Sequence, residues 1–596
     1  MKKQIENKKE EQIHKIRHSL SHLLAAAVLE KWPKTKLAIG PVIDNGFYYD
    51  FDFPAPISDK DLESLEKRMR ELARQNLDFT KKKITFIQAK KLFVKASYKM
   101  ELIKELNQKK SSLSIYETSV GKGKLKKEVF MDLCSGPHVN NTNEINSEGL
   151  KLTHLAGAYW RGDEKNKMLT RIYGVAFEDK KTLNEYLKMM EEAEKRDHRK
   201  LGRELDLFTF SEYIGSGLPL YTPRGALIRR LLNDYIESLQ VKAGYTQVWT
   251  PQIAKAELFK ISGHYDKYKN DMFRVVSNYS DEEFYLKPMN CPQHTQIYKS
   301  RARSYRDLPI RYTDFAMLYR DERPGELSGL ARVRSFSQDD CHIFCREDQV
   351  DKEIDTALEM TKKVMGIFGF KYKYRLSTRD PKHPEKYLGD PKTWDKVEKW
   401  AEKIMKRNKI EYFDGPGEAA FYAPKMDLIA TDALGRDWQL STVQIDFVFP
   451  ERFGLTYIDK DGKEKHPVMI HRAIIGSPER FIMVLLEHYA GAFPLWLSPV
   501  QIEVIPVSEK HLNYAKEIEE KIKENGARVE VADANETLGK RIREAELQKI
   551  PYVLIVGDKE KQSNSVSIRS YKKGQEGEMK IDKFIEKIVK EIKNRE

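Results

Sequence analysis

The stretch from Leu318 to Cys345 constrains the fold of this chain more than any other part of the sequence. Charged, amide, aromatic and imidazole side chains recur there at every second position: Arg332, Arg334, Phe336, Gln338, Asp340 and His342. Side chains of a β-strand alternate between its two faces, so this spacing predicts a strand with all six groups on one face. Burial alone does not favour such a set, because each polar group costs free energy when it leaves water. The pattern therefore favours a functional face.

A second strand is predicted just upstream, because Arg320 and Glu322 share a parity. The segment PGELSG, which separates them from Arg332, is rich in turn-forming residues. We therefore expect a hairpin made of a strand, a long loop and a strand. The alternative is an amphipathic strand with a solvated charged face, which would explain one such arginine but not six positions in register.

This hairpin resembles motif 2 of the class II aminoacyl-tRNA synthetases, and the segment DFAMLYRDE…GLARVRSFSQDDCHIF is similar to that of the threonyl-tRNA synthetases. Residues 215–253 resemble motif 1, a helix and strand that form a dimer interface, and residues 476–491 resemble motif 3. In motif 3, Ser477 is a predicted N-cap, Pro478 fits the first helical turn, and Arg480 lies beside it. A helix N-terminus with an arginine favours phosphate binding.

The resemblance covers nearly the whole chain and implies a multidomain α+β protein. It predicts a class II catalytic domain built on an antiparallel sheet, with an N-terminal α+β editing domain and a C-terminal α/β anticodon-binding domain. The expected boundaries are 1–178 for the editing domain, 179–204 for a linker helix, 205–498 for the catalytic domain and 499–596 for the anticodon-binding domain. The small ubiquitin-like domain that often precedes the editing domain is expected to be absent, because few residues precede the helix predicted at 12–32. Strands are predicted at 418–428 and 438–447, and a mostly parallel sheet after Pro499.

By resemblance, the chain activates L-threonine with ATP to threonyl-adenylate and transfers it to the 3′ end of tRNA(Thr). The first step joins two anions, so it depends on positioning and on charge stabilisation by arginines and Mg²⁺. The implied ATP-binding residues are Arg320, Glu322, Arg332, Phe336, Gln439, Thr442 and Arg480. The implied catalytic residues are Arg320, Arg480, Lys425 and His264. Arg320 is expected at the α-phosphate, Arg480 at the γ-phosphate and His264 near the tRNA 3′ end.

Recognition of threonine is expected to need a metal. Valine has the same shape, and an apolar pocket separates such pairs by only about a hundredfold. The resemblance implies one Zn²⁺ per chain, bound by Cys291, His342 and His471, with an open position for the amino and hydroxyl groups of threonine. The other implied threonine-binding residues are Met289, Gln338, Asp340, Tyr422 and Gln444. A rival cluster of Cys341, His342 and Cys345 is disfavoured, since the two thiols point away from His342 on a strand.

The sequence departs from the family pattern at a few positions. Gln293 stands where the family has glycine in NCPGH, and it adds bulk near the expected metal. Ala419 and Ala423 replace glycines, and Tyr319 replaces a histidine before Arg320. None of these changes removes an expected ligand.

A second site is predicted from two pairs of residues. His18 and His22 are four residues apart on the helix predicted at 12–32, and Cys134 and His138 lie in the segment DLCSGPHV. Four such groups suit zinc, and they equally suit a hydrolytic pocket with a histidine base and Asp132 or Cys134 orienting water. The resemblance implies an editing site that hydrolyses Ser-tRNA(Thr), and of the two chemistries we favour the metal-free one. Editing is needed because serine lacks only a methyl group, which is worth about 1–3 kcal/mol.

At the C-terminus, the residues that match family positions for the anticodon are Asn535, Arg543, Glu560 and Arg569. The net charge of +14 suits a polyanionic partner such as tRNA.

Only four cysteines are present, which indicates a reducing compartment, and we expect a cytoplasmic homodimer without a membrane span. Two alternatives remain, a non-catalytic RNA-binding relative and a separate deacylase or metal hydrolase. The first would usually have lost a motif arginine.

Overall fold

The computed structural model describes residues 2–121 and 126–595. The chain divides into two compact units, Met1–Glu191 and Glu192–Glu596, and the division falls within the segment predicted to be a linker helix. That segment forms two helices, α5 (Lys180–Lys195) and α6 (His198–Glu204), so the prediction of a single helix was wrong. Asp197 interrupts it, because its backbone is not helical and its carboxylate caps α6 by accepting from the Arg199 N–H.

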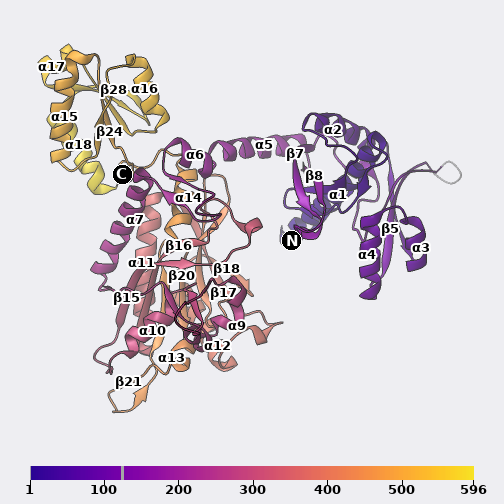
Figure 1. Ribbon diagram of the computed structural model, residues 1–596, viewed down its shortest axis with the longest axis horizontal. Helices are drawn as coiled ribbons and strands as arrows, with labels where there is room; N and C mark the ends of the chain where they lie inside the picture. The colour runs from indigo at the N-terminus through magenta and orange to yellow at the C-terminus, as the bar shows by residue number, and fades with distance from the viewer. Residues whose placement is uncertain (1, 122–125, 596) are drawn as a thin grey trace. The chain divides into compact units, whose positions relative to one another are not determined.

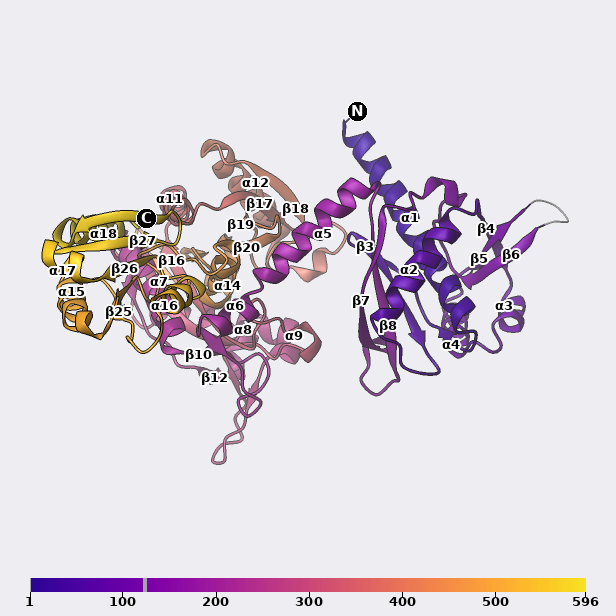
Figure 2. The ribbon, with the colours of Figure 1, turned by 90° about the horizontal axis from the view of Figure 1, so that it is seen from above.

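The first unit is built on helix α1, which covers a curved antiparallel sheet together with α2 (Figure 2). The apolar face of α1 is buried through Leu20, Leu23 and Leu24, which pack with Phe47 and Phe51 of the sheet. The sheet runs β1-β3-β8-β7, with β2 paired to β3. The bounds are α1 Lys2–Lys31, β1 Lys36–Leu37, β2 Val42–Ile43, β3 Gly46–Asp52, α2 Lys60–Ala73, β7 Leu150–Tyr159 and β8 Met168–Ala176.

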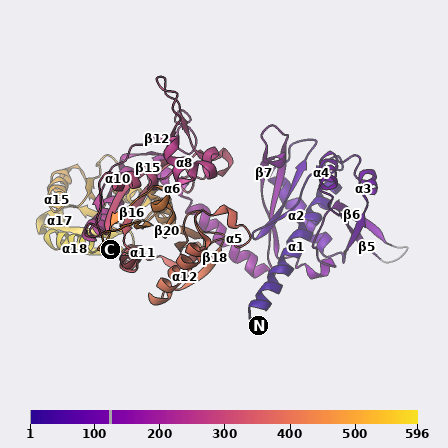
Figure 3. The same ribbon diagram turned by 90° about the horizontal axis from the view of Figure 1, so that it is seen from below.

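A second, smaller sheet lies in the same unit, with strands in the order β4-β5-β6 and with α3 and α4 beside it (Figure 3). Its elements are β4 Asp78–Ile84, α3 Phe86–Leu92, α4 Ser97–Gln108, β5 Leu113–Val120 and β6 Lys127–Leu133. Strand β6 leads directly into the segment that carries Cys134 and His138. Helix α1 and the segment that follows β6 therefore belong to the same unit.

The second unit contains an eight-stranded sheet in the order β11-β15-β16-β23-β20-β19-β17-β18 (Figure 1). The strands are antiparallel except at the pairs β11–β15 and β17–β18, so the prediction of an antiparallel catalytic sheet is confirmed. Cys341 and Ile343 of β16 belong to the largest apolar cluster, which α7, α11 and α14 also line. These bounds are α7 Pro223–Lys242, β11 Thr246–Gln247, β15 Ile310–Tyr319, β16 Ser335–Cys345, α11 Val350–Phe368, β17 Lys371–Thr378, β18 Tyr412–Pro416, β19 Lys425–Thr431, β20 Asp437–Asp446, β23 Val468–Ala473 and α14 Pro478–His488.

Further elements surround this sheet. They are β9 Phe208–Thr209, β10 Leu220–Tyr221, β12 Ile253–Lys255, α8 Ala256–Ser262, α9 His264–Tyr268, β13 Arg274–Val275, β14 Phe284–Leu286, α10 Cys291–Lys299, α12 Pro391–Arg407, α13 Val448–Arg452, β21 Tyr457–Ile458 and β22 Glu464–Lys465. Strands β12, β14 and β13 form a small antiparallel sheet of their own.

Two sequence predictions about this unit need correction. The hairpin is confirmed as β15 and β16, but β16 begins at Ser335, so Arg332 and Arg334 precede the strand instead of lying on its face. A turn formed by residues 328–332 takes up that part of the chain. The strand predicted at 418–428 begins only at Lys425. Cys291 is the first residue of α10, where Pro292 suits the first turn.

The C-terminal part forms a five-stranded sheet in the order β25-β24-β26-β27-β28. Strands β25, β24 and β26 are parallel, whereas β27 and β28 are antiparallel, so the sheet is more mixed than the sequence indicated. The bounds are β24 Ile502–Pro506, α15 Leu512–Glu524, β25 Val529–Val531, α16 Leu538–Leu547, β26 Tyr552–Val556, α17 Asp558–Ser563, β27 Ser565–Ser570, β28 Gly574–Lys580 and α18 Ile581–Asn594. Across the described residues, no helix combines the length and the apolar character that a membrane crossing requires.

Candidate functional site

Cys291, His342 and His471 meet in the second unit although they come from distant parts of the sequence. His342 on β16 and His471 on β23 are direct cross-strand partners, so their side chains project from the same face of the sheet. Cys291 is brought to them by the start of α10. The ligand atoms of the three residues all lie within 4.8 Å of one another, and all three residues are buried.

Both imidazoles are held by a neighbour at one nitrogen and face each other at the other. His471 Nε2 lies 2.9 Å from Asp446 Oδ2, and His342 Nδ1 lies 2.8 Å from His294 Nδ1. His342 Nε2 and His471 Nδ1 are 3.0 Å apart. Metal-binding histidines commonly have such partners, which fix the tautomer and the ring orientation. The donor set and its supporting contacts therefore fit a metal ion with thiolate and imidazole ligands.

Neighbouring residues leave this centre clear. The Gln293 amide turns to the carbonyl of Pro251, to which Nε2 donates at 3.0 Å. Cys341 lies on the opposite face of β16, where its thiol donates to Thr313 Oγ1. Cys345 is likewise part of the apolar cluster on that side. The rival ligand set with these two thiols therefore does not form around His342.

A cavity of about 660 Å³ opens beside this centre. It brings together many of the predicted substrate residues, namely His264, Met289, Arg320, Glu322, Arg332, Tyr422, Lys425 and Gln444. Burial lowers the pKa of Arg320, and the nearby Glu322 carboxylate does not fully offset this effect. A cavity with an incompletely compensated guanidinium favours an anionic ligand such as a phosphate or a carboxylate.

Phe336 and Arg480 complete the arginine-rich end of the site. The Arg320 guanidinium lies 5.0 Å from the centre of the Phe336 ring. Arg480 is placed by the start of α14, where Ser477 accepts a hydrogen bond from its backbone N–H, as the sequence predicted. The pKa of Arg480 is lowered by burial and then by the charges of Arg320 and Arg332. Three guanidiniums thus share one region, and a polyanion would relieve their mutual repulsion.

Asp427 organises the opposite side of the site, and sequence analysis did not single it out. This buried carboxylate accepts from Thr442 Oγ1 at 2.8 Å and from Gln439 Nε2 at 3.0 Å. It also pairs with Arg375 at 3.0 Å and with Lys425 at 3.3 Å. An aspartate two positions after Lys425 in an otherwise apolar strand was the available signal, because it shares the face of Lys425.

The remaining predicted threonine contacts lie around the metal-ligand set. Burial, followed by the charges of Asp314 and Asp339, raises the pKa of Asp340 to about 8. The ring centroid of Tyr422 is 4.9 Å from that of His471. His264 is buried at the start of α9, with Nδ1 2.8 Å from Ser262 Oγ, and burial lowers its pKa to about 3. His264 is therefore neutral near pH 7.

The first unit brings His18, His22, Cys134 and His138 together, with all four ligand atoms within 4.8 Å of one another. Cys134 Sγ lies 3.3 Å from His18 Nε2 and 3.3 Å from His138 Nε2. Burial raises the pKa of Cys134 to about 11 and lowers that of the buried His22 well below its usual value. A cavity of about 420 Å³ is lined by His18, His22, Asp132 and Cys134.

Two further residues belong to this second site and were missed from the sequence. Lys99 Nζ forms a buried ion pair of 2.6 Å with Asp132 Oδ1, and Tyr49 Oη donates to Asp132 Oδ2 at 2.5 Å. Lys99 also lines the cavity. Neither residue lies in a recognisable pattern with Asp132, so only the folded unit reveals this contact.

Comparisons with known proteins identify the family of this chain. Three family models match the chain: "tRNA synthetase class II core domain (G, H, P, S and T)" at residues 273–489, "Anticodon binding domain" at 501–591, and "Threonyl and Alanyl tRNA synthetase second additional domain" at 114–173. The threonine–tRNA ligase of Rubrobacter xylanophilus is 46% identical over 585 residues, which is 98% of this chain and 89% of the relative. The chain belongs to the threonine–tRNA ligase family. Another threonine–tRNA ligase, from Dehalococcoides mccartyi, is 45% identical, with 97% of each chain covered.

Solved structures of threonyl-tRNA synthetases are also similar to this chain. One is described as the RNA binding domain of the Cryptosporidium parvum enzyme, with a TM-score of 0.63, 39% identity, and 66% of this chain and 98% of that chain covered. A putative threonyl-tRNA synthetase of Aeropyrum pernix gives a TM-score of 0.59 with 28% identity, and the match covers 67% of this chain and 96% of that chain. The family, the enzyme class and the class II fold predicted from the sequence are thereby confirmed.

The residues predicted to read the anticodon are spread over the C-terminal part of this chain. Asn535 and Arg543 are exposed, the first before α16 and the second on it. Glu560 Oε2 accepts from the Gly557 N–H at 2.9 Å, and Arg569 pairs with Glu546 at 2.7 Å. Their role and the proposed domain boundaries remain predictions.

Proposed function

We propose that this chain charges tRNA(Thr) with threonine by means of the residues described above, and that it edits Ser-tRNA(Thr) in its first unit. The observation that carries the proposal is the convergence of Cys291, His342 and His471 beside a cavity lined by Arg320. A set of metal ligands alone fits many enzymes, and a cavity lined by arginines alone fits any class II synthetase. Because the two lie side by side, they favour a substrate amino acid with a hydroxyl group, bound next to ATP and Mg²⁺.

In the first step, Arg320 binds both the threonine carboxylate and the α-phosphate and so brings two anions within reach. Arg480 and Arg332 bind the remaining phosphates, and Phe336 stacks on adenine. Gln439 and Thr442 contact the nucleotide and are held by Asp427. Positioning together with fixed positive charge supplies most of the rate enhancement for such a displacement. In the second step, the neutral His264 assists the transfer near the tRNA 3′ end.

Threonine selection rests on the ligand set and on its neighbours. We propose that Cys291, His342 and His471 hold one zinc ion, which, when bound, provides a Lewis-acid position for the amino and hydroxyl groups of threonine. Asp340 accepts the hydroxyl hydrogen, and Gln338, Met289, Tyr422 and Gln444 orient the substrate. Valine has no hydroxyl group, so it leaves a buried acceptor unpaired and is rejected.

Serine retains the hydroxyl group, so the first unit supplies a second selection. We propose a metal-free hydrolytic site in which one histidine of the set His18, His22 and His138 acts as the base. Cys134 or Asp132 orients the water, and Lys99 fixes Asp132. Burial, followed by the charges of His18 and Lys99, lowers the pKa of His22. The charge of Lys99 would also repel a divalent cation there. His22→Ala should leave charging intact and let Ser-tRNA(Thr) accumulate. Unchanged hydrolysis of Ser-tRNA(Thr) by that variant would contradict the editing role.

We also infer a homodimer in the cytoplasm, through the region that resembles motif 1. Large apolar side chains are exposed there: Trp249 is 83% exposed, Val241 68% and Ile253 44%. Exposed apolar patches commonly mark interfaces. The molar mass from light scattering should be twice that of one chain. Trp249→Asp should shift the equilibrium towards monomer, and a monomeric parent protein would overturn the inference.

The decisive experiment combines metal analysis with threonine-dependent ATP–pyrophosphate exchange. The parent protein should contain one zinc ion per chain and support exchange, whereas Cys291→Ser should lose both. Cys345→Ala is the matched control, because Cys345 is buried on the other face of β16, and it should retain both. A Cys291→Ser protein that keeps metal and exchange would refute the ligand assignment. Exchange in the parent protein also excludes the two alternatives, an RNA-binding relative and a separate deacylase.

A further inference from the structure

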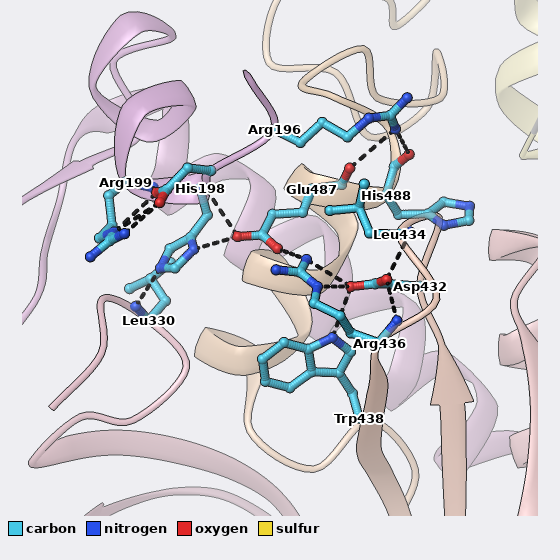
Figure 4. Close-up of polar contacts among 11 residues, drawn as sticks. Arg196, His198, Arg199, Leu330, Asp432, Leu434, Arg436, Trp438, Glu487 and His488 are labelled. Carbon is cyan, nitrogen blue, oxygen red and sulfur yellow. Dashed lines mark hydrogen bonds and ion pairs between the residues drawn. The ribbon is translucent and has the colours of Figure 1, made fainter. Parts of the chain in front are cut away.

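His198 connects the start of α6 to the turn that precedes β16 (Figure 4). Its imidazole is buried, and Nε2 accepts a hydrogen bond of 3.1 Å from the backbone N–H of Leu330. A backbone N–H can only donate, so Nε2 carries no proton and the imidazole proton lies on Nδ1. Nδ1 therefore donates to Glu487 Oε1, 2.7 Å away. These two bonds fix both the tautomer and the orientation of the ring.

Glu487, near the end of α14, is itself fixed on both sides (Figure 4). Oε1 also accepts from the backbone N–H of His198 at 3.1 Å, and Oε2 pairs with Arg436. Arg436 Nε in turn donates to Asp432 Oδ2 at 2.8 Å, and that carboxylate also accepts from Trp438 Nε1 at 3.0 Å. His198 is thus braced by a network that reaches the loop between β19 and β20.

The turn of residues 328–332 fits closely against His198. Ser328 N–H donates to the Arg332 carbonyl at 3.1 Å, and Ala331 N–H donates to the Ser328 carbonyl at 2.8 Å. Gly329 has a φ of +47°, and a Cβ added there would lie 2.0 Å from His198 Nε2. Only glycine therefore lets the ring approach closely enough to bind Leu330.

The same turn determines where two arginines of the nucleotide site lie. The Ala331 carbonyl accepts from Arg480 Nε at 3.2 Å. Arg332, the last residue of the turn, donates from Nε to Glu322 Oε2 at 2.8 Å. Neither His198 nor Glu487 lines the cavity. A shift of the turn would therefore move Arg332 and Arg480 without touching the threonine side of the site.

We propose that His198, braced by Glu487, is a positioning residue for ATP binding, because its Nε2 atom holds the turn that sets Arg332 and Arg480. This inference rests on the proposed role of those two arginines in binding ATP. It extends the nucleotide site to the segment at the start of the second unit, before the predicted catalytic domain begins.

Two amide substitutions separate the bonds of His198. His198→Gln can place an oxygen near the position of Nε2 and accept from Leu330, whereas His198→Asn can place its amide near Nδ1 and donate only to Glu487. His198→Asn should raise the KM for ATP about five- to tenfold in pyrophosphate exchange, as loss of one hydrogen bond predicts. The KM for threonine should stay within about twofold, and His198→Gln should restore the KM for ATP. Arg199→Ala, at an exposed neighbour paired with Asp197, should match the parent protein.

Hydrogen exchange at the Leu330 amide gives an independent readout. Exchange should accelerate in His198→Asn but not in His198→Gln, and Gly329→Ala, which pushes the ring away from the turn, should accelerate it as well. The proposal would be overturned if His198→Asn and His198→Gln changed the KM for ATP and the KM for threonine equally. It would also be overturned if His198→Asn left the KM for ATP unchanged while Arg332→Ala raised it. If Arg332→Ala itself leaves the KM for ATP unchanged, the proposed nucleotide role of Arg332 fails. Leu330 exchange then still decides whether His198 holds the turn.

Discussion

Lys99 and Asp132 form an ion pair of 2.6 Å in the first unit, and each side chain is only 4% exposed. Two charges are costly to bury, and the remaining one is costlier still when its partner is removed. This pair lies in the wall of the proposed editing cavity, where it fixes Asp132 beside Cys134. Loss of this pair would therefore affect both the stability of the unit and the geometry of the site.

Lys99→Met should therefore reduce both stability and editing. We expect a loss of about 3–5 kcal/mol in the free energy of unfolding of this unit, because Asp132 would remain charged and buried. Hydrolysis of Ser-tRNA(Thr) should fall, while threonine-dependent exchange stays normal. Lys104→Met, at an exposed position of α4, is the matched control. Normal deacylation by a stable Lys99→Met protein would rule out a role for the pair in editing.

Asp427→Asn should weaken ATP binding. Asparagine preserves the shape, but it removes the charge that holds Arg375 and Lys425. It also replaces one of the two acceptor oxygens with a donor, either Oδ1, which Thr442 and Gln439 share, or Oδ2, which faces Arg375. We expect the KM for ATP to rise about tenfold, corresponding to the loss of a charged hydrogen bond. Asp437→Asn, at the exposed start of β20, serves as control. A similar rise in the KM for threonine would instead indicate general damage to the sheet.

Metal removal should separate the two sites. Dialysis against a chelator is expected to abolish threonine-dependent exchange, because Cys291, His342 and His471 would lose the ion that they are proposed to hold. Hydrolysis of Ser-tRNA(Thr) should persist, because the first unit is proposed to be metal-free. Re-addition of zinc should restore exchange. Loss of both activities on chelation, with a second zinc ion per chain in the untreated protein, would assign metal to the editing site as well.

Glu503 should make stability depend on pH. Burial, followed by the charges of Glu530 and Glu544, raises the pKa of this carboxyl from 4.5 to about 7. The folded chain then binds more protons than the unfolded chain between these pH values, so the free energy of unfolding falls as pH rises from 4.5 to 7. Glu503→Gln should remove roughly 1–2 kcal/mol of this loss. Its Tm should exceed that of the parent protein at pH 8 and match it near pH 4.5, and equal Tm values at both would contradict the assignment.

Features that depend on neighbouring residues could be predicted from the sequence. The alternation from Phe336 to His342 correctly placed these side chains on one strand, because strand period is a local property. The cap by Ser477 was equally readable, since capping depends on residues within one helical turn. The alternation failed at Arg332 and Arg334, where the turn at Gly329 and its contact with His198 override the strand pattern.

The sequence by itself determined the family, the hairpin and the types of side chain that are candidate metal ligands, because these follow from local periodicity and from motifs. Only the tertiary structure decided that His342 and His471 are cross-strand partners, that Asp427 and Lys99 organise the two sites, and that His198 reaches Leu330. Strand order and register join residues far apart in the chain, and no local pattern encodes which of them will meet.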